Sequence, residues 1–231
     1  MTINVYWASL EQEWLRADQP EPVYKDFVKN KKNIESFISF CPAIKEYNKN
    51  IFSLKSIYDY EFEINRNAGG AWSPLYDQKF YDNHVEVRSL EDKLFSFSQK
   101  IIFFTEKKSL LMSAGIFPYL EDNEITKRCI TIPGKFDIGK WFRTTDFAFY
   151  LRDGIDSFKI KEGEVYQYLK FDTNEKINFK QFKTNEIINK YVTDITSVKD
   201  FRRPKIRNLS EFYSTMKHKK YIIKEIKNNL L

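Results

Sequence analysis

One segment with glycines and lysines is the first candidate for chemistry. Residues 134–140 read Gly-Lys-Phe-Asp-Ile-Gly-Lys and agree with the first seven positions of a phosphate-binding P-loop. The eighth position of that motif is Ser or Thr, whose hydroxyl binds magnesium, and here it is Trp141. Residues 142–151 have the pattern of a strand, not of the helix whose N-terminus would hold a phosphate. The segment therefore predicts a turn between strands.

Metal ligands and nucleophiles are scarce. The two histidines, His84 and His218, lie in no HExxH or facial-triad pattern, and the two cysteines, Cys41 and Cys129, form no CxxC pair. We expect both cysteines to be reduced and buried, and nothing in the spacing supports a Cys129–His84 catalytic pair. The acidic residues of 121–124 favour a solvated loop over a carboxylate metal site. The sequence predicts no metal and no cofactor.

Aromatic and arginine side chains supply a candidate contact surface. Trp141 and Arg143 precede a region of strands, and Tyr166 and Tyr168 fall on the polar side of one of them. Tryptophan, tyrosine and arginine are the types that stack on sugars, bases or protein partners. We predict that these four residues bind a ligand or partner. The alternative is a tyrosine-rich sheet face that a helix or loop covers.

Two carboxylates offer a second kind of site. Asp146 and Glu164 lie on the polar sides of neighbouring predicted strands. If the sheet closes toward a barrel, the two could perform acid–base work on a small molecule such as a sugar, without a metal. A deep pocket that joins them would favour this hypothesis.

The last 24 residues predict a basic amphipathic helix, with Asn208 and Glu211 spaced as a capping box. Its apolar stripe is formed by Leu209, Phe212, Met216, Ile223, Ile226 and Leu230. Its basic face is formed by Lys217, Lys219, Lys220, Lys224 and Lys227. The full apolar stripe favours packing on the sheet, and the lysines leave nucleic-acid binding as an alternative.

Two-residue alternation of polar and apolar side chains indicates the strands that would position these groups. Residues 58–64 alternate clearly, and residues 145–182 contain three further alternating segments, which predict a meander or jelly-roll wall. Phe147, Val165 and Ile177 are expected to face a shared interior. Further strands are predicted at 3–7, 85–88, 101–104, 110–117 and 129–132, with a hairpin turn at 105–109, and helices at 33–41 and 43–48.

Length and composition indicate one globular domain. The chain has 231 residues, 42% of them hydrophobic, and a net charge of +6. No apolar run approaches the roughly 18 residues of a membrane helix, and no signal peptide is visible, so we expect a cytoplasmic location. We predict a single domain, 1–231. It would comprise an N-terminal strand and helices (1–57), a β-sandwich core (58–183) and a helical extension (184–231).

Several segments resemble known proteins. Phe40-Cys41-Pro42-Ala43-Ile44 and residues 47–59, together with 133–143, resemble an uncharacterised family of tailed bacteriophages, marine T4-like phages included. Residues 158–166, with Glu162-Gly163 at a turn, resemble a strand-turn-strand of cupin-like barrels. The resemblance implies a phage-type protein, located in the host cytoplasm, and carries no activity. The histidine metal motif of cupins is absent.

Together these patterns predict a mainly β fold, a β-sandwich or cupin-like jelly roll with short N-terminal helices and a C-terminal amphipathic helix. The first expectation for function is a non-catalytic accessory or structural protein that binds a macromolecular partner. The partner expected first is another protein. The alternatives are a metal-independent small-molecule site and nucleic-acid binding through the C-terminal helix. A homo-oligomer is left open, and no membrane partner is expected.

Overall fold

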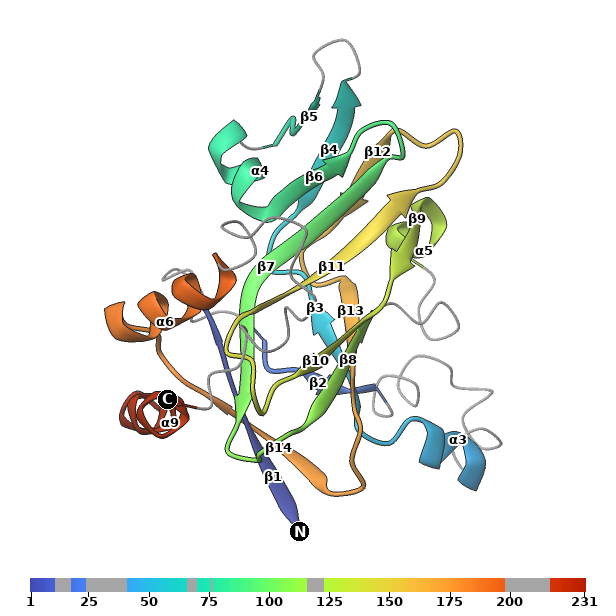
Figure 1. Ribbon diagram of the computed structural model, residues 1–231. Helices are drawn as coiled ribbons and strands as arrows, with labels where there is room; N and C mark the ends of the chain where they lie inside the picture. Colours follow the sequence, from blue (N-terminus) through green and yellow to red (C-terminus); the bar gives the residue numbers. More distant parts are fainter. Residues whose placement is uncertain (11–17, 24–40, 66–69, 76, 116–122, 198–216) are drawn as a thin grey trace, which may run out of the picture.

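The fold is mainly β and sandwich-like (Figure 1). The computed structural model describes residues 1–10, 18–23, 41–65, 70–75, 77–115, 123–197 and 217–231. Two larger sheets and one three-stranded sheet make up the body. None of the helices in these ranges is long and apolar enough to cross a membrane.

The first sheet has six strands, five of them in the order β14-β1-β7-β11-β9, with β6 also pairing with β7. Their bounds are β1 (Thr2–Ser9), β6 (Val85–Ser89), β7 (Leu94–Thr105), β9 (Cys129–Ile132), β11 (Thr144–Leu151) and β14 (Lys176–Gln181). β1 runs parallel to β14 and antiparallel to β7. The first strand of the chain therefore lies between a middle strand and a late one.

The other two sheets complete the sandwich. The second has the order β10 (Gly134–Asp137), β8 (Leu111–Gly115), β13 (Val165–Phe171), β3 (Ile51–Lys55) and β2 (Glu21–Pro22). The third has the order β12 (Ser157–Ile160), β4 (Tyr60–Asn65) and β5 (Gly70–Trp72). The helices are α3 (Pro42–Tyr47), α4 (Gln78–His84), α5 (Glu124–Arg128), α6 (Glu186–Thr196) and α9 (Lys219–Asn228).

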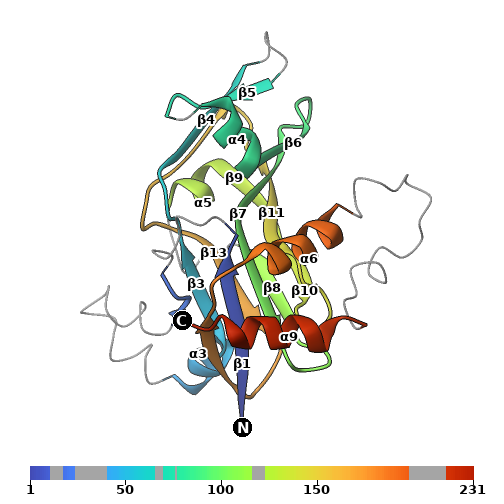
Figure 2. The same ribbon diagram turned by 90° about the vertical axis from the view of Figure 1, so that its left-hand side faces the viewer.

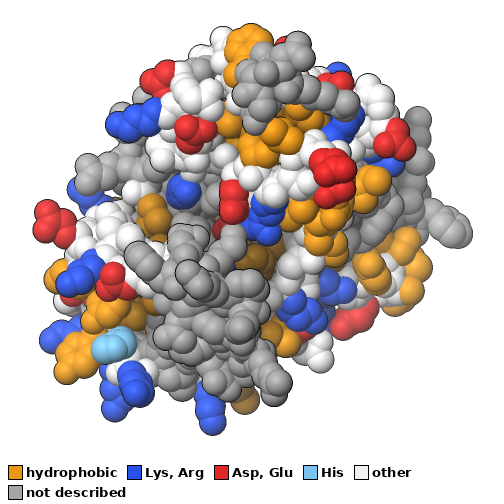
Figure 3. Space-filling view, turned by 45° about the horizontal axis from the view of Figure 1, so that its top comes forward, with side chains coloured by type: hydrophobic (Ala, Val, Ile, Leu, Met, Phe, Trp, Pro, Cys, Tyr) orange, Lys and Arg blue, Asp and Glu red, His pale blue; other side chains and the backbone are white. Residues whose placement is uncertain are grey.

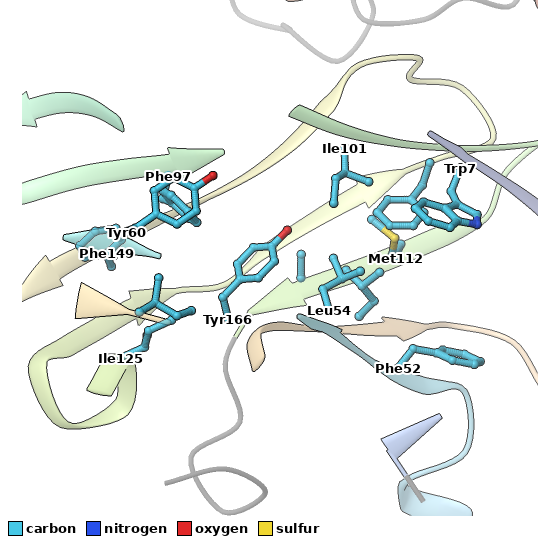
Figure 4. Close-up of a cluster of buried hydrophobic side chains, with 14 of the residues drawn as sticks. Trp7, Phe52, Leu54, Tyr60, Phe97, Ile101, Met112, Ile125, Phe149 and Tyr166 are labelled. Carbon is cyan, nitrogen blue, oxygen red and sulfur yellow. The ribbon is translucent and has the colours of Figure 1, made fainter. Parts of the chain in front are cut away.

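The main core lies between the sheets and is rich in aromatic rings (Figure 4). Phe62 and Phe158 stack with centroids 5.0 Å apart, and Phe149 lies 5.1 Å from Phe158. The first contact lies within the third sheet, and the second joins that sheet to the first. Alternation explains their placement, because every second residue of each strand points to the same side.

A second core covers the opposite side of the first sheet, where α6 and α9 lie (Figure 2). The sheet contributes Tyr6, Ala8, Ile102, Phe104 and Phe142, and the helices contribute Ile188, Val192, Ile195, Ile222, Ile223 and Ile226. α9 therefore packs on the sheet, as its pattern favours, through Ile222, Ile223 and Ile226. Of the predicted stripe, Leu230 lies beyond α9 and is 39% exposed, and Leu209, Phe212 and Met216 lie outside the described residues. β1 and this part of β7 are buried on both faces.

Most predicted strands are confirmed, at 3–7, 58–64, 85–88, 101–104 and 129–132 and within 145–182. The helix predicted at 43–48 is α3, which begins at Pro42, because proline is tolerated at the first helical position. The helix predicted at 33–41 and the cap at Asn208 lie outside the described residues.

Two predicted connections are wrong. The strands on either side of 105–109 form no hairpin, because β7 belongs to the first sheet and β8 to the second. The segments of 145–182 form no meander either, since β11, β12, β13 and β14 lie in the first, third, second and first sheets. Local periodicity specifies the sides of a strand but not the sheet it joins.

Candidate functional site

The outer face of the first sheet, the side away from the main core, changes character along β11. Phe142, just before this strand, is buried under α6 and α9. Thr144 and Asp146 follow on the same side and line a pocket, and Tyr150 beyond them is 36% exposed. The face is thus covered at one end, hollowed in the middle and open at the other end.

An irregularity in β7 creates the hollow. Thr145 pairs with Ile101 and Phe147 with Phe97, so that one residue of β11 faces three residues of β7, Ser98 to Lys100. Such bulges kink a strand and occur often beside functional sites. Lys100 has a φ of +52°, which is costly for a residue with a side chain.

Local hydrogen bonds fix the bulge. The Lys100 N–H donates to Ser98 Oγ (3.1 Å), and the Ser98 hydroxyl donates to the Thr145 carbonyl (3.4 Å). Leu10 N–H donates to the Lys100 carbonyl (3.1 Å). β11 pairs with one edge of β7. On the other edge, β1 pairs with residues 101–105 of β7 and β6 pairs with residues 94–97. The bulge therefore lies between two partner strands, where the sheet leaves a notch.

The pocket at this notch has a volume of about 280 Å³. Its charged lining residues are Asp82, Glu86, Lys100, Arg143 and Asp146, and hydroxyls come from Ser96, Ser98, Thr144 and Thr196. They are supplied by α4, β6, β7, β11, α6 and the residue before β11. A pocket this rich in both charges and hydroxyls suits a hydrophilic ligand.

Arg143 and Asp146 are the least exposed of the paired charges in the pocket. Arg143 Nη2 lies 3.6 Å from Asp146 Oδ2, and the two side chains are 13% and 20% exposed. Arg143 Nε also donates to the Thr144 carbonyl (3.2 Å). Asp146 Oδ1 is fully buried and has no hydrogen-bond partner among the described residues. A buried carboxylate oxygen without a donor is unfavourable. The Asp146 side chain as a whole is 20% exposed and lines the pocket, so the rest of its carboxylate can accept a hydrogen bond from a ligand.

His84 forms a fixed wall of the pocket. Its Nδ1 lies 2.8 Å from the Phe80 carbonyl, which can only accept, so Nδ1 carries the proton. The ring also lies 4.4 Å from the ring of Phe80 and 5.6 Å from that of Tyr60. These contacts hold the imidazole against the core and fix its orientation.

The predicted surface of Trp141, Arg143, Tyr166 and Tyr168 does not exist as one surface. Arg143 lines the pocket, and Trp141 is half-buried against the second core. Tyr166 and Tyr168 are each 2% exposed, so their expected exposure is wrong. Figure 4 shows Tyr166 pointing into the main core, where burial raises the pKa of its hydroxyl.

A bulge in β13 explains this error. Val165 pairs with Lys55 and Gln167 with Leu54, so β13 has one extra residue there. The extra residue reverses the alternation, and Tyr166 joins Leu169 in the main core while Val165 moves to the opposite side. Tyr168 packs with Val165 in a small third cluster. The expectation that Val165 shares the main interior with Ile177 is therefore also wrong, and the Phe147 side chain lies outside the described residues.

Glu164 is not part of the pocket. Its Oε2 accepts a hydrogen bond from the Lys161 N–H (2.9 Å) in the turn before β13. Asp146 and not Glu164 lines the pocket at the β7 bulge. The structure thus does not bring the two predicted carboxylates together there.

The P-loop-like segment contains the predicted turn, at 138–140, but its first four residues form strand β10, which was not predicted. Asp137 occupies the turn and accepts hydrogen bonds from Ser109 Oγ (2.7 Å), Leu110 N–H (3.2 Å) and Gly139 N–H (3.1 Å). A Cβ on Gly139 would lie 2.7 Å from the Lys107 carbonyl oxygen. The second glycine of the motif therefore permits close approach of backbone, a role unrelated to phosphate.

The cysteines and acidic residues show no reactive or metal site. Cys41 and Cys129 are both free thiols, and burial raises the pKa of Cys129 to about 12. Glu124 accepts a hydrogen bond from Arg128 Nε (2.6 Å), and its acidic neighbours at 121 and 122 lie outside the described residues. Within the described ranges no cluster of His, Cys, Asp and Glu could hold a metal ion.

Several pocket residues were missed from the sequence. Asp82 and Glu86 reach the pocket from α4 and β6, and β6 lies beside β7 only in the folded sheet. One signal was visible, because the polar run Ser98-Gln99-Lys100 interrupts the apolar segment 94–105. Such an interruption marks the bulge.

Comparisons with known proteins identified no relative of this chain. No family model, no curated protein and no solved structure matches this chain.

Proposed function

We propose that this chain is a binding protein whose pocket at the β7 bulge holds a small hydrophilic ligand. The observation that supports this most is the Arg143–Asp146 ion pair in the wall of the pocket, whose side chains are only 13% and 20% exposed and are therefore largely shielded from water. A ligand hydroxyl or ammonium would donate to the exposed part of the Asp146 carboxylate, while Arg143 and Lys100 would donate to a ligand oxygen.

The charges of the pocket narrow the ligand class. Two cationic and three anionic side chains line it, so a multiply charged anion such as a nucleotide would meet both attraction and repulsion. A neutral polyol or sugar offers donors and acceptors on neighbouring atoms and fits this mixed lining. The proposal keeps the metal-independent, sugar-type site expected as an alternative from the sequence, with Arg143 in place of Glu164 as the partner of Asp146.

The macromolecular partner expected first from the sequence takes second place. Two of its four proposed contacts, Tyr166 and Tyr168, are buried. The phage-type accessory role remains a hypothesis that rests on the resemblance alone.

The test is a binding screen with a matched pair of variants. Thermal unfolding is measured with monosaccharides, disaccharides, sugar alcohols and amino acids, because a ligand that binds the native state raises the Tm. Asp146→Asn should weaken a hit about tenfold or more, since it removes a hydrogen bond to a charged group. Asp153→Asn, at an exposed turn, should leave affinity unchanged. A panel without any Tm shift, or equal affinity of both variants, would refute the proposal.

Lys100→Gly separates binding from stability. Glycine adopts positive φ without steric cost, so the variant should be as stable as the parent or slightly more stable. It also removes a donor from the pocket, so affinity for the same hit should fall. Loss of stability without loss of affinity would show that Lys100 serves the fold alone.

A further inference from the structure

We infer that the solvent face of α9 binds single-stranded nucleic acid, a second function independent of the pocket. This face, together with Lys217 in the turn just before the helix, is the α9 basic face; it comprises Lys217, Lys220, Tyr221, Lys224 and Lys227. All five side chains are exposed, and Tyr221 is 68% exposed.

Lys224 lies three residues after Tyr221, which puts the two side chains on the same side of α9. Lys217 lies in the turn just before the helix begins at Lys219. Lysines neutralise backbone phosphates, and an exposed aromatic ring between them can stack on an unpaired base. The combination suits a single strand better than a duplex, whose bases are already stacked on each other.

The position of the helix is fixed by its opposite face. Ile222, Ile223 and Ile226 are buried in the second core, so the apolar face of α9 cannot enter a membrane. The exposed side is therefore a polar, cationic surface on a rigid support. An anionic membrane could be attracted only by charge, without insertion.

Lys219 ties the start of α9 to two loops that contain further lysines. Its ammonium donates to the Gly139 carbonyl (2.5 Å) and to the Lys107 carbonyl, and it lies 5.3 Å from the ring of Phe104. This holds the β7–β8 loop against the helix start. In that loop Lys107 is paired with Glu175 (2.8 Å), and the exposed Lys108 extends the cationic surface beyond the helix.

On the face drawn in Figure 3, acidic and basic side chains are interspersed between hydrophobic ones. On α9, Glu225 is half-buried and its carboxylate accepts from Asn185 Nδ2 (2.7 Å), so it does not point an open negative charge at this surface. Lys227 is paired with Glu106, which leaves the stronger field near Lys217, Lys220 and Lys224.

The experiment measures fluorescence anisotropy of a labelled 15-nucleotide oligo-dT against the full chain at several salt concentrations. Contacts from Lys217, Lys220 and Lys224 predict a log–log salt slope of roughly −2, because each phosphate contact on a single strand contributes about 0.7. Lys220→Glu with Lys224→Glu should reduce the slope to roughly −0.7 and weaken binding at least about tenfold at low salt. The control, Lys45→Glu with Lys161→Glu, makes the same charge change at exposed sites outside α9 and should have little effect.

A second variant tests the base contact. Tyr221→Ala should weaken oligo-dT binding at least about fivefold, and Tyr47→Ala, a comparably exposed tyrosine on α3, should not. Circular dichroism of each variant checks that the fold is kept.

Three outcomes would overturn the inference. The first is no binding at 50 mM salt, and the second is equal weakening by both charge-reversed pairs. The third is equal or tighter binding of heparin or phosphatidylserine vesicles with no effect of Tyr221→Ala, which would show that any polyanion or lipid surface suffices.

Discussion

Asp137 shows how single side chains hold the connections of this fold. It is 5% exposed, and Lys140 Nζ lies 2.9 Å from its carboxylate in addition to the three hydrogen bonds of the turn. Burial alone would raise the pKa of Asp137, but the hydrogen bonds from Lys140, Ser109 and Leu110 outweigh it and lower the pKa. The ionised carboxylate therefore stabilises the native state.

Asp137→Asn should lower the free energy of unfolding by about 2 to 4 kcal/mol at neutral pH. Because the folded pKa is depressed, the contribution is present above the ordinary pKa of about 4 and is lost as the pH falls through the folded value. The difference from the parent protein, measured by urea unfolding, should therefore shrink in acid. Asp172→Asn, at an exposed ion pair with Lys135, should cost less than about 1 kcal/mol, and a difference independent of pH would contradict this account.

Helix α9 is stabilised by packing and not by its termini. It has no side-chain N-cap and no acidic residue in its first turn, so the lysines there oppose the helix dipole. The burial of Ile222, Ile223 and Ile226 must compensate. α6, by contrast, begins with Asn185, whose side chain accepts from Ile188 N–H.

Ile226→Ala should therefore destabilise the protein by about 2 to 4 kcal/mol, since Ile226 is completely buried. Ile187→Ala on α6, where the side chain is 54% exposed, should change the free energy of unfolding by less than about 0.5 kcal/mol. Chemical denaturation of both variants compares them directly, and equal effects would show that the second core contributes little.

The sequence predicted the individual strands and helices better than the way in which the strands pair. Alternation located β4 and β14 because the side chains of each strand alternate between a buried side and a more exposed side. It failed for β13, which is buried on both sides and contains a bulge. It found Arg143 and Asp146 but not the pocket, because the pocket depends on where β1 stops and β6 begins along β7. Those boundaries are set by tertiary pairing.

The whole molecule is organised around the first sheet, which separates the main core from the second core. On β1, Val5 and Trp7 face the main core, and Tyr6 and Ala8 face the second. The two cores therefore share strand β1. If the packing of one core is lost and β1 moves, the β1 side chains of the other core become exposed.

We accordingly predict that the chain unfolds in a single cooperative transition. Differential scanning calorimetry should give a calorimetric enthalpy equal to the van't Hoff enthalpy, and Ile226→Ala should move the whole peak to lower temperature. Two resolved peaks, with Ile226→Ala moving only one, would show that α6 and α9 form a separate unit.

The parallel pairing of β1 with β14 has a consequence for biosynthesis. Asn4 and Asn178, which are hydrogen-bonded across this pair, are 174 residues apart. At about 5 to 20 residues per second, a ribosome needs roughly 10 to 35 s to make the later strand after the earlier one. During that time β1, with Val5 and Trp7, has one edge open, so the nascent chain is the state most exposed to aggregation and to chaperone capture.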